Sequence, residues 1–390
     1  MTTDTALSSP ALTFHWFLPT SGDSRSIVGG GHGAAGKGGD RLLDLRYLRQ
    51  LVQAAETNGF ESVLTPTGTW CKDPWITDAA LIEATETIKF LVAVRPGLIS
   101  PTLLAQAAAD FQTFSGNRLA VNIVTGGEEV EQQSYGDFLD KEQRYRRTAD
   151  FLEIVTRLWR GEKVTYEGAH LRVRDAFLSA PPAVAPRILF GGSSPLAGEV
   201  AAKYVDAYLT WGEPPELVQQ KVDWIDGLAA QQGRAVAQGI RFHVISRDTT
   251  EEAWAVAEKL LGGITPEDVR VAQKGFRTSG SEGQRRMSRL HDRGNAFTET
   301  TTARDLEIYP NIWAGVGLVR GGAGTALVGS HAEVADRIIE YSSIGVTEFV
   351  LSGYPDLEEA YYFGEGVVPE LLARGVPVKN HPAPSPVPVP

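Results

Sequence analysis

One arginine stands alone in the glycine-rich run NIWAGVGLVRGGAGTALVGS, which extends over residues 311–330. This residue is Arg320, and the glycines near it give the backbone a freedom that other residues lack: Gly315, Gly317, Gly321, Gly322 and Gly324. A single cation between such hinges is typical of a loop that closes a guanidinium onto a bound anion. Taken alone, the run could equally be a flexible surface linker with an incidental arginine.

Two further candidates, Arg241 and His243, lie two positions apart in the segment GIRFHVI. On a strand, this spacing points both side chains to the same face, and their apolar neighbours then face the covering helices. A buried arginine is costly without an anionic partner, so Arg241 indicates anion binding. His243 alone could be a core histidine with satisfied hydrogen bonds, but its place beside Arg241 favours a functional role.

The only cysteine and one tyrosine lie just beyond predicted strand ends. Cys71, in TPTGTWCKDPW, has no assured base beside it, and most lone cysteines are small buried residues, but its position favours a place in the site. Tyr354, in SGYP, could shape a turn or donate a hydrogen bond to a substrate oxygen. A single cysteine permits no intrachain disulfide, and no H-x-x-H, H-E-x-x-H or carboxylate cluster predicts a metal site.

A phosphate could bind at the turn LFGGSSP, which opens a predicted helix directly after a strand. Its glycines allow close approach to the backbone, Ser193 and Ser194 supply hydroxyls, and the amino terminus of the helix favours negative charge. The same residues could be no more than a helix cap. Tyr145, in FLDKEQRYRRTADF, could pack against a helix start or place its phenol near such a phosphate.

The scaffold that must position these residues alternates predicted strands with predicted helices. The predicted strands are 12–18, 62–65, 89–94, 119–124, 188–190, 207–209, 240–245 and 349–352. The predicted helices are 45–55, 76–87, 102–114, 144–159, 197–204, 216–231, 251–261 and 333–343. Such alternation implies parallel strands covered by helices. Eight strands, and no G-x-G-x-x-G after the first, favour a (β/α)8 TIM barrel over a doubly wound sheet.

The barrel is expected to be a single domain over residues 1–374. It is interrupted by a glycine-rich excursion at 21–40, a hairpin at 163–173, a polar insertion at 263–310 and the loop at 311–330, which we expect to be mobile. Residues 375–390 form a proline-rich extension that cannot continue a helix. Active sites of such barrels form at the carboxyl ends of the strands. This placement adds Asn122 and Thr125 at the end of the fourth strand and Trp211 after the sixth.

Composition excludes several classes of partner. The 390 residues carry a net charge of −11, and no basic cluster interleaved with aromatics occurs, which argues against nucleic acid and anionic membranes. Hydrophobic residues make up 42%, enough for a real core. No apolar run is long enough to span a bilayer, and the first residues lack the pattern of a signal peptide, so we expect a cytoplasmic protein.

Several segments together resemble one known family, from about Phe14 to about Leu372. They are FLPTSGD, SVLTPTGTWCKDPW, KFLVAVRPGLISPT, NIVTGG, LFGGSSP, YLTWGEPPE, GIRFHVI, NIWAGVGLVRGGAGTALVG and FVLSGYPDLEEAY. The chain resembles the bacterial luciferase-like flavin monooxygenases, and among them the alkanesulfonate monooxygenases of two-component systems that use reduced FMN.

The resemblance implies roles for the candidate residues. It places Cys71, Arg241, His243, Arg320 and Tyr354 in the active site and Trp211 in the substrate pocket. It assigns the flavin site to five residues, the last three near the phosphate: Asn122, Thr125, Tyr145, Ser193 and Ser194. It also implies a homodimer or homotetramer, and a separate NAD(P)H-dependent flavin reductase that supplies reduced FMN.

The resemblance further implies that O2 and reduced FMN oxidise an organosulfonate, with cleavage of its C–S bond to an aldehyde and sulfite. An alkanesulfonate and the sugar sulfonate sulfoquinovose are both candidate substrates, because the excursion at 21–40 and the tail could reshape the pocket mouth. The alternatives are another luciferase-like flavin or deazaflavin oxidoreductase, such as a sulfone monooxygenase, and a flavin-binding barrel without turnover.

Overall fold

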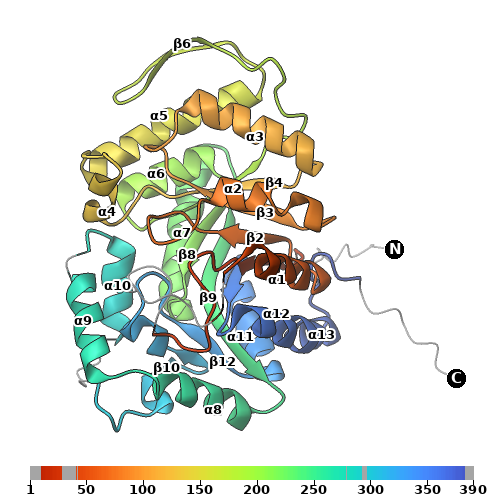
Figure 1. Ribbon diagram of the computed structural model, residues 1–390, viewed down its shortest axis with the longest axis vertical. Coiled ribbons are helices and arrows are strands. Elements are labelled where there is room, and N and C mark those ends of the chain that lie inside the picture. Colours follow the sequence, from red (N-terminus) through yellow and green to blue (C-terminus); the bar gives the residue numbers. More distant parts are fainter. Residues whose placement is uncertain (1–9, 29–40, 42, 278, 292–296, 383–390) are drawn as a thin grey trace, which may run out of the picture.

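Eight parallel strands close into a barrel in the computed structural model, which describes residues 10–28, 41, 43–277, 279–291 and 297–382 (Figure 1). The barrel strands, in spatial order, are β9 (Ala237–Arg247), β13 (Val346–Ser352), β1 (Thr13–Phe17), β2 (Ser62–Thr65), β3 (Lys89–Val94), β4 (Leu119–Ile123), β7 (Arg187–Gly191) and β8 (Ala207–Trp211). Pairing of β8 with β9 completes the circle. The predicted (β/α)8 TIM barrel is confirmed.

Helices connect successive strands and cover the barrel. In the described residues they are α1 (Leu45–Thr57), α2 (Pro74–Ala79), α3 (Pro101–Ser115), α4 (Glu129–Ser134), α5 (Lys141–Trp159), α6 (Pro195–Tyr204), α7 (Pro215–Gln231), α8 (Thr250–Leu261), α9 (Pro266–Arg277), α10 (Glu282–His291), α11 (His331–Ser343), α12 (Asp356–Tyr362) and α13 (Val368–Ala373). The helix predicted at 76–87 is wrong in extent. There, Thr65 Oγ1 donates to the buried Asp78 near the end of α2, and a separate 3-10 turn follows at Ile82–Ala84.

Capping side chains fix where α5 and α11 begin. Asp140 accepts from the backbone N–H of Gln143 while the Gln143 side chain accepts from the Asp140 N–H, and this capping box starts α5. Ser330 and Glu333 form the same box at α11. Because such boxes satisfy N–H groups that a helix leaves unpaired, the helix starts and the loops before them are held in place.

The barrel interior is layered. At the amino ends of the strands, His15 Nδ1 forms a hydrogen bond with Ser62 Oγ (2.7 Å), and His15 Nε2 lies 3.2 Å from Glu348 Oε2. Glu348 also pairs with Arg187, and we call His15, Glu348 and Arg187 the charged plug. An apolar layer lies above this charged plug: Leu64, Leu91, Ala120, Leu189, Ala207 and Val350. The apolar layer separates the plug from the carboxyl ends, where a cavity opens.

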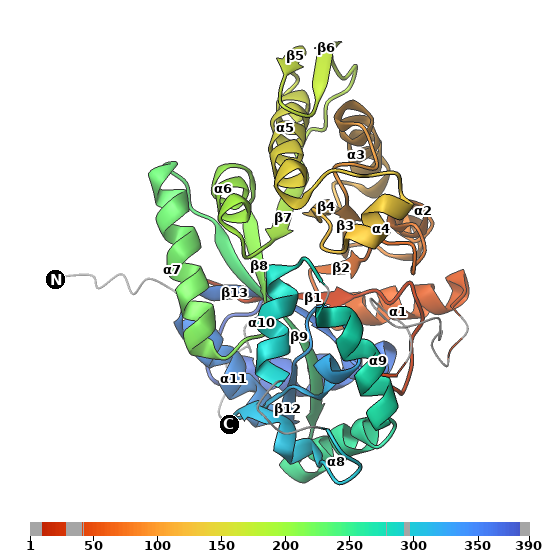
Figure 2. The same cartoon turned by 90° about the vertical axis from the view of Figure 1, so that its left-hand side faces the viewer.

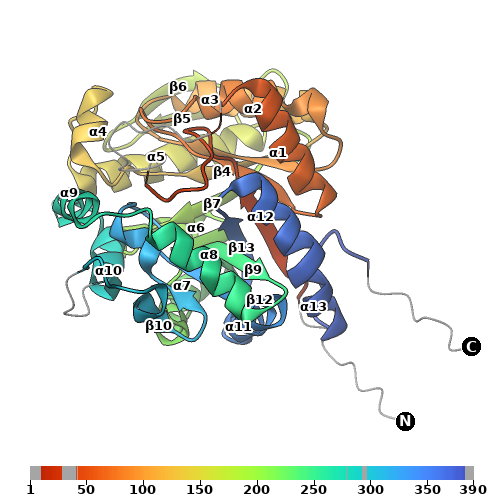
Figure 3. The same ribbon diagram turned by 60° about the horizontal axis from the view of Figure 1, so that its bottom comes forward.

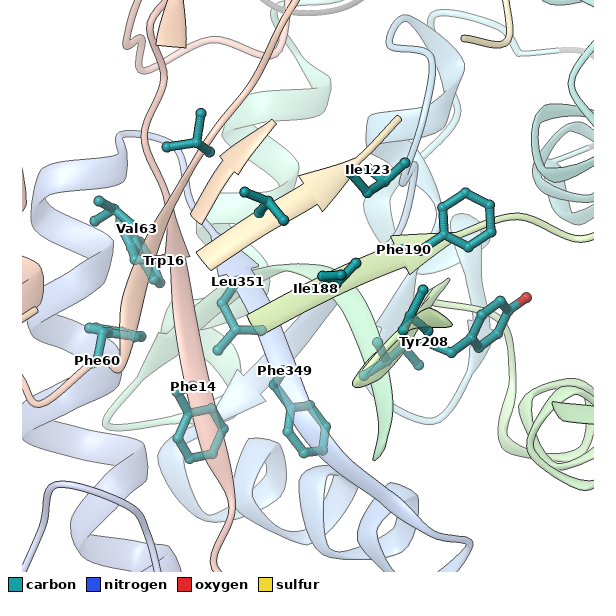
Figure 4. Packing of buried hydrophobic residues seen from close by; sticks show 14 of the residues in the cluster. Phe14, Trp16, Phe60, Val63, Ile123, Ile188, Phe190, Tyr208, Phe349 and Leu351 are labelled. Carbon is teal, nitrogen blue, oxygen red and sulfur yellow. The ribbon is translucent and has the colours of Figure 1, made fainter. Parts of the chain in front are cut away.

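Aromatic residues on the outer face of the strands pack against the helices, as Figure 4 shows around β1. The Phe14 and Phe349 rings lie 5.5 Å apart, and the Trp16 and Phe60 rings 4.9 Å apart. All four side chains are buried, and each contributes roughly 1.5–3 kcal/mol by leaving water. This outer core alternates with the inward-facing residues, as the period of two requires.

The glycine-rich run 311–330 is more structured than a single mobile loop. It contains β11 (Ile312–Trp313), a 3-10 turn (Gly315–Leu318) and β12 (Ala326–Ser330), and only the residues between the turn and β12 form an irregular loop. The reason is burial, since Leu327 and Val328 are fully buried and β12 pairs in parallel with the outer half of β9. β10 (Glu307–Tyr309) and β11 extend this sheet beyond the barrel.

Two excursions lie outside the barrel. β5 (Val164–Glu167) and β6 (Arg172–Ala176) form an antiparallel hairpin that projects beyond α5 (Figures 1 and 2). The insertion at 263–310 contributes α9 and α10, which lie side by side (Figure 2). Most of the excursion at 21–40 lies outside the described residues.

The start of the proline-rich extension lies at the amino ends of the strands. Just before β1, the backbone N–H of Leu12 donates to Pro377 O at 2.8 Å, and Leu12 O accepts from the backbone N–H of Lys379 at 2.9 Å. α1 and α12, on the same side of the barrel, lie together (Figure 3). Residues 376–382 therefore lie away from the cavity of their own barrel, and residues 383–390 are outside the described part. No helix within the described ranges has the length and apolar character needed to cross a membrane.

The charged plug predicts an acid-dependent contribution to stability. The His15 ring and the Arg187 guanidinium, outweighing burial, lower the pKa of Glu348 from 4.5 to about 2. Such a carboxylate stabilises the fold above pH 4.5, and this stabilisation is lost as the pH falls toward 2. Glu348→Gln should lower the free energy of unfolding at pH 7 by about 3 kcal/mol.

Urea unfolding between pH 3.5 and 7 measures this difference, which must shrink below pH 4.5. Glu142→Gln, on the exposed face of α5, is the control and should change stability little. If the difference in unfolding free energy between wild type and Glu348→Gln stays constant with pH, the ionised Glu348 does not stabilise the fold as proposed.

Candidate active site

A cavity of about 390 Å³ opens at the carboxyl ends of the barrel strands. Its walls come from every barrel strand or from the residue that follows it: Phe17, Leu64, Arg95, Asn122, Gly191, Trp211, Arg241 and Ser352. The glycine-rich loop supplies Arg320 to Ala323, and α10 with the residue before it supplies Ser281 to Gln284. The cavity lies where the barrel fold predicts an active site.

Arg241 points into the barrel, as its spacing on β9 predicts. Its guanidinium donates to Ser352 Oγ at 2.7 Å and to the carbonyl oxygens of Phe242 and Val350, and it lies over the Phe17 ring. Burial lowers the pKa of Arg241 to about 10, which still leaves it cationic at neutral pH. All these partners are neutral, so the hydrogen bonds fix the position of the guanidinium but no bonded carboxylate cancels its positive charge.

His243 connects β9 to the glycine-rich loop. Its Nε2 lies 3.0 Å from Ala323 O, which requires Nε2 to carry the proton, so Ser352 Oγ donates to Nδ1 at 2.7 Å. Burial, and the positive charges of Arg241 and Arg320, hold the pKa of His243 well below its usual value of 6.5. The imidazole is therefore neutral, and Ser352 links it to Arg241.

Arg320 reaches the same cavity from the loop. Its guanidinium donates to the hydroxyl of Tyr354, whose ring stacks on His243 with centroids 5.1 Å apart. Burial raises the pKa of Tyr354, so the phenol keeps its proton. Neither Arg320 nor Arg241 forms an ion pair with any carboxylate in the described part of the chain. Two cations thus border one cavity without a direct anionic partner.

A pair of carboxyl groups also borders the cavity, and sequence reasoning missed both. Asp356 follows Tyr354 by two residues, and its backbone N–H donates to Asp23 Oδ1 at 2.9 Å. Burial raises the pKa of both, and Asp23 adds to the increase at Asp356. Asp23 is further held by Tyr47 and Arg41. The only available signal was the position of Asp356 just beyond a strand end.

The opposite end of the cavity is rich in donors and positive charge. Asn122, Thr125, Tyr145 and Ser193 all line it, as does Lys141 at the start of α5. The Tyr145 hydroxyl interacts with Thr125 and Ser194, which moderate the rise that burial causes in its pKa. Tyr208 donates to Gly192 O at 2.7 Å, which fixes the turn after β7.

This end offers the groups that bind a phosphate in proteins. It offers hydroxyl donors, an ammonium group and the turn that opens α6, where a phosphate would be favoured. Ser194 itself does not line the cavity, since its hydroxyl caps α6 by accepting from Ala197 N at 3.3 Å.

Two predicted site residues occupy distinct places. Trp211 lines the cavity, with its ring close to Gly283 of α10. Cys71 is not among the lining residues, and its thiol points to the carbonyl oxygens of Pro66 and Gly68 at 3.5 and 3.4 Å. Burial raises the pKa of Cys71 to about 11, which disfavours the thiolate. The described residues contain no group of three or more potential metal ligands.

Comparisons with known proteins agree with this fold. Residues 12–348 match the luciferase-like monooxygenase family. A crystal structure of riboflavin lyase with modified FMN and riboflavin is similar, with TM-score 0.75, 22% identity, and coverage of 96% of this chain and 94% of that one.

Two further solved structures share the fold. EDTA monooxygenase from Chelativorans sp. BNC1 has TM-score 0.71 and 19% identity, over 96% of this chain and 97% of that one. Long-chain alkane monooxygenase has TM-score 0.75 and 19% identity, over 94% and 92%. These three structures share the (β/α)8 barrel fold with this chain. The chain belongs to the luciferase-like monooxygenase family.

The buried carboxyl pair makes a prediction about pH. Because the pKa of Asp356 is raised well above 3.8, the folded chain keeps a proton there that the unfolded chain releases. Stability from this group is present below pH 3.8 and is lost as the pH rises toward the pKa of the folded state. Asp356→Asn removes the titration, so the free energy of unfolding of the variant should increase relative to wild type between pH 4 and 8.

Urea titrations followed by tryptophan fluorescence measure this difference. The exposed Asp110→Asn exchange on α3 is the control, because it removes one charge without touching the pair. A stability difference that falls as the pH rises would show that Asp356 is ionised and stabilising in the folded state.

Proposed function

We propose that the chain is a monooxygenase that uses reduced FMN and O2 to cleave the C–S bond of an organosulfonate. The observation that carries this proposal is the pair of guanidinium groups, Arg241 and Arg320, which border one cavity without forming an ion pair. A sulfonate presents three oxygens to such a pair. Because the present partners of the arginines are neutral, both guanidinium groups can still form charge-assisted hydrogen bonds, which are stronger than bonds between neutral groups.

The two arginines would bind the sulfonate in different ways. Arg241 is fixed on β9 by Ser352 and by backbone carbonyls, so it defines the position of the anion. Arg320 comes from the loop and would close over the anion, with Tyr354 as a hydrogen-bond donor beside it. Closure excludes water from the reacting groups.

Reduced FMN would be held at the opposite end, with its phosphate at Tyr145, Ser193 and Lys141 and its ring near Asn122 and Thr125. When bound, it supplies the two electrons that reduce one oxygen atom of O2 to water while the other enters the substrate. The balanced reaction is RCH2SO3⁻ + FMNH2 + O2 → RCHO + HSO3⁻ + FMN + H2O. A separate NAD(P)H-dependent reductase would supply the reduced flavin, and we propose a homodimer or homotetramer.

Proton transfer would involve His243, at a defined atom. Since Nε2 is protonated and bound to Ala323, the imidazole can accept a proton only at Nδ1, where Ser352 now donates. Acceptance is resisted by the two arginines and becomes easier when the sulfonate neutralises them. The arrangement therefore couples anion binding to the basicity of His243. Cys71, as the structure places it, would support the loop after β2.

The proposal is tested by sulfite release. The purified chain, a flavin reductase, NAD(P)H, FMN and O2 should release sulfite from at least one member of a panel of linear alkanesulfonates and sulfoquinovose. Reactions without FMN, and with superoxide dismutase and catalase, separate enzymatic cleavage from attack by free oxygen species. Sulfones without a sulfonate group are included, and turnover of these alone would replace the proposed substrate class.

A second prediction separates the two ends of the cavity. Arg241→Met should raise the KM for the sulfonate about 100-fold, the effect of losing roughly 2–3 kcal/mol from a charged hydrogen-bond pair. Binding of reduced FMN, followed by anaerobic fluorescence titration, should change less than about twofold, since Arg241 lies away from the phosphate end. Ser193→Ala is the matched variant with the opposite pattern. Equal losses of both ligands in Arg241→Met would show that the two sites are wrongly separated.

A further inference from the structure

Two side-chain contacts from the polar insertion at 263–310 to the glycine-rich loop flank Arg320. Gln273 of α9 donates through Nε2 to Gly317 O and Leu318 O, each at 3.0 Å. Gln284 of α10 accepts at Oε1 from Gly322 N at 2.9 Å. One contact precedes Arg320 and the other follows it.

The second contact is enclosed and specific. Gln284 is only 5% exposed and lines the cavity, so its amide bridges the loop and the cavity wall. Gly322, which donates to it, has a φ of +89°, in a region that favours glycine. A substitution in the loop at this position would therefore disturb the contact as well as the backbone.

The insertion is itself anchored to the barrel by a buried charge network. Arg286 of α10 donates to both carboxylate oxygens of Glu213, after β8, at 2.8 and 2.6 Å. Lys221 of α7 donates to the same carboxylate at 2.9 Å and to Thr210 Oγ1 at 2.7 Å. Glu213 is 1% exposed, so α10 is attached to a rigid part of the barrel.

Close packing gives α10 a fixed distance from the pocket wall. A Cβ at Gly283 would lie 2.9 Å from the ring of Trp211, so only glycine allows α10 to lie against this cavity-lining residue. Just before the helix, Ser279 Oγ donates to Glu128 at 2.5 Å and Lys141 Nζ donates to Gly280 O at 3.1 Å. The helix and the residues before it thus contact the loop after β4, the start of α5, the end of β8 and the glycine-rich loop.

From these contacts we infer that Gln273 and Gln284 are positioning residues that hold Arg320 over the cavity, with the insertion acting as their support. Neither is a catalytic residue. Their effect on the reaction rests on the proposed sulfonate-binding role of Arg320, whereas their effect on the loop does not. The inference explains why a polar insertion with two amphipathic helices lies beside the cavity of this barrel.

Limited trypsin digestion tests the inference on the intact protein, because Arg320 is the only tryptic site between residues 311 and 330. Gln273→Glu replaces the donating amide with an oxygen that repels both carbonyls, and Gln284→Met removes the acceptor. Gln284→Met should raise the rate of cleavage after Arg320 about fivefold, as expected for the loss of one hydrogen bond, and Gln273→Glu, which loses two, should raise it at least as much. Mass spectrometry of the fragment that begins at Gly321 gives this rate separately from other cuts.

Gln284→Glu is the matched control, since its carboxylate can still accept from Gly322 N, and it should be cut at the wild-type rate. Equal cleavage rates in all variants, or Gln284→Glu cut as fast as Gln284→Met, would overturn the inference. A variant that is cut throughout the chain is unfolded and does not report on the loop. In that case the cleavage rate of the variant at the other glutamine, which lies on a different helix, tests the inference.

Kinetics provide the second readout. With any sulfonate that supports turnover, Gln273→Glu should raise KM about fivefold while the dissociation constant of reduced FMN stays within about twofold, as expected for a loop contact remote from the phosphate end. A change in flavin affinity without a change in KM would argue against positioning of Arg320. Absence of turnover with every sulfonate would refute the proposed function, and the trypsin result would still decide the role of the glutamines.

Discussion

The architecture depends on holding a positive charge inside the barrel without an adjacent negative one. Arg241 is stabilised by carbonyl oxygens, a hydroxyl and an aromatic ring, all of them neutral. Such a set solvates the cation but leaves its charge available to a ligand. The charge of Asp356 acts on Arg241, but burial and Asp23 raise the pKa of Asp356, which reduces its tendency to neutralise the arginine. The barrel therefore keeps an attraction for anions.

The lower part of the barrel uses charge in the opposite way. Glu348 is fully paired with His15 and Arg187, so the charges there cancel and contribute to the fold. An apolar layer separates this plug from the cavity. The same strands thus carry paired charges at their amino ends and arginines without a carboxylate partner at their carboxyl ends. The paired charges stabilise the fold, and the arginines remain available to a ligand.

Sequence periodicity was sufficient for the barrel and for the side chains on its strands. Arg241 and His243 point inward because residues two apart on a strand share a face, and this rule needs no tertiary information. Asp23 meets Asp356 across 333 positions, and Gln284 reaches Gly322 from an insertion without strand periodicity. Contacts of this kind depend on how loops fold back over the strand ends, which local patterns do not encode.

The backbone bonds between Leu12 and residues 377–379 bring two distant parts of the chain together beneath the barrel, on the side away from the cavity. Joining such neighbouring segments covalently would cost little loop-closure entropy. The protein is therefore well suited to circular permutation, with new ends placed in the projecting hairpin.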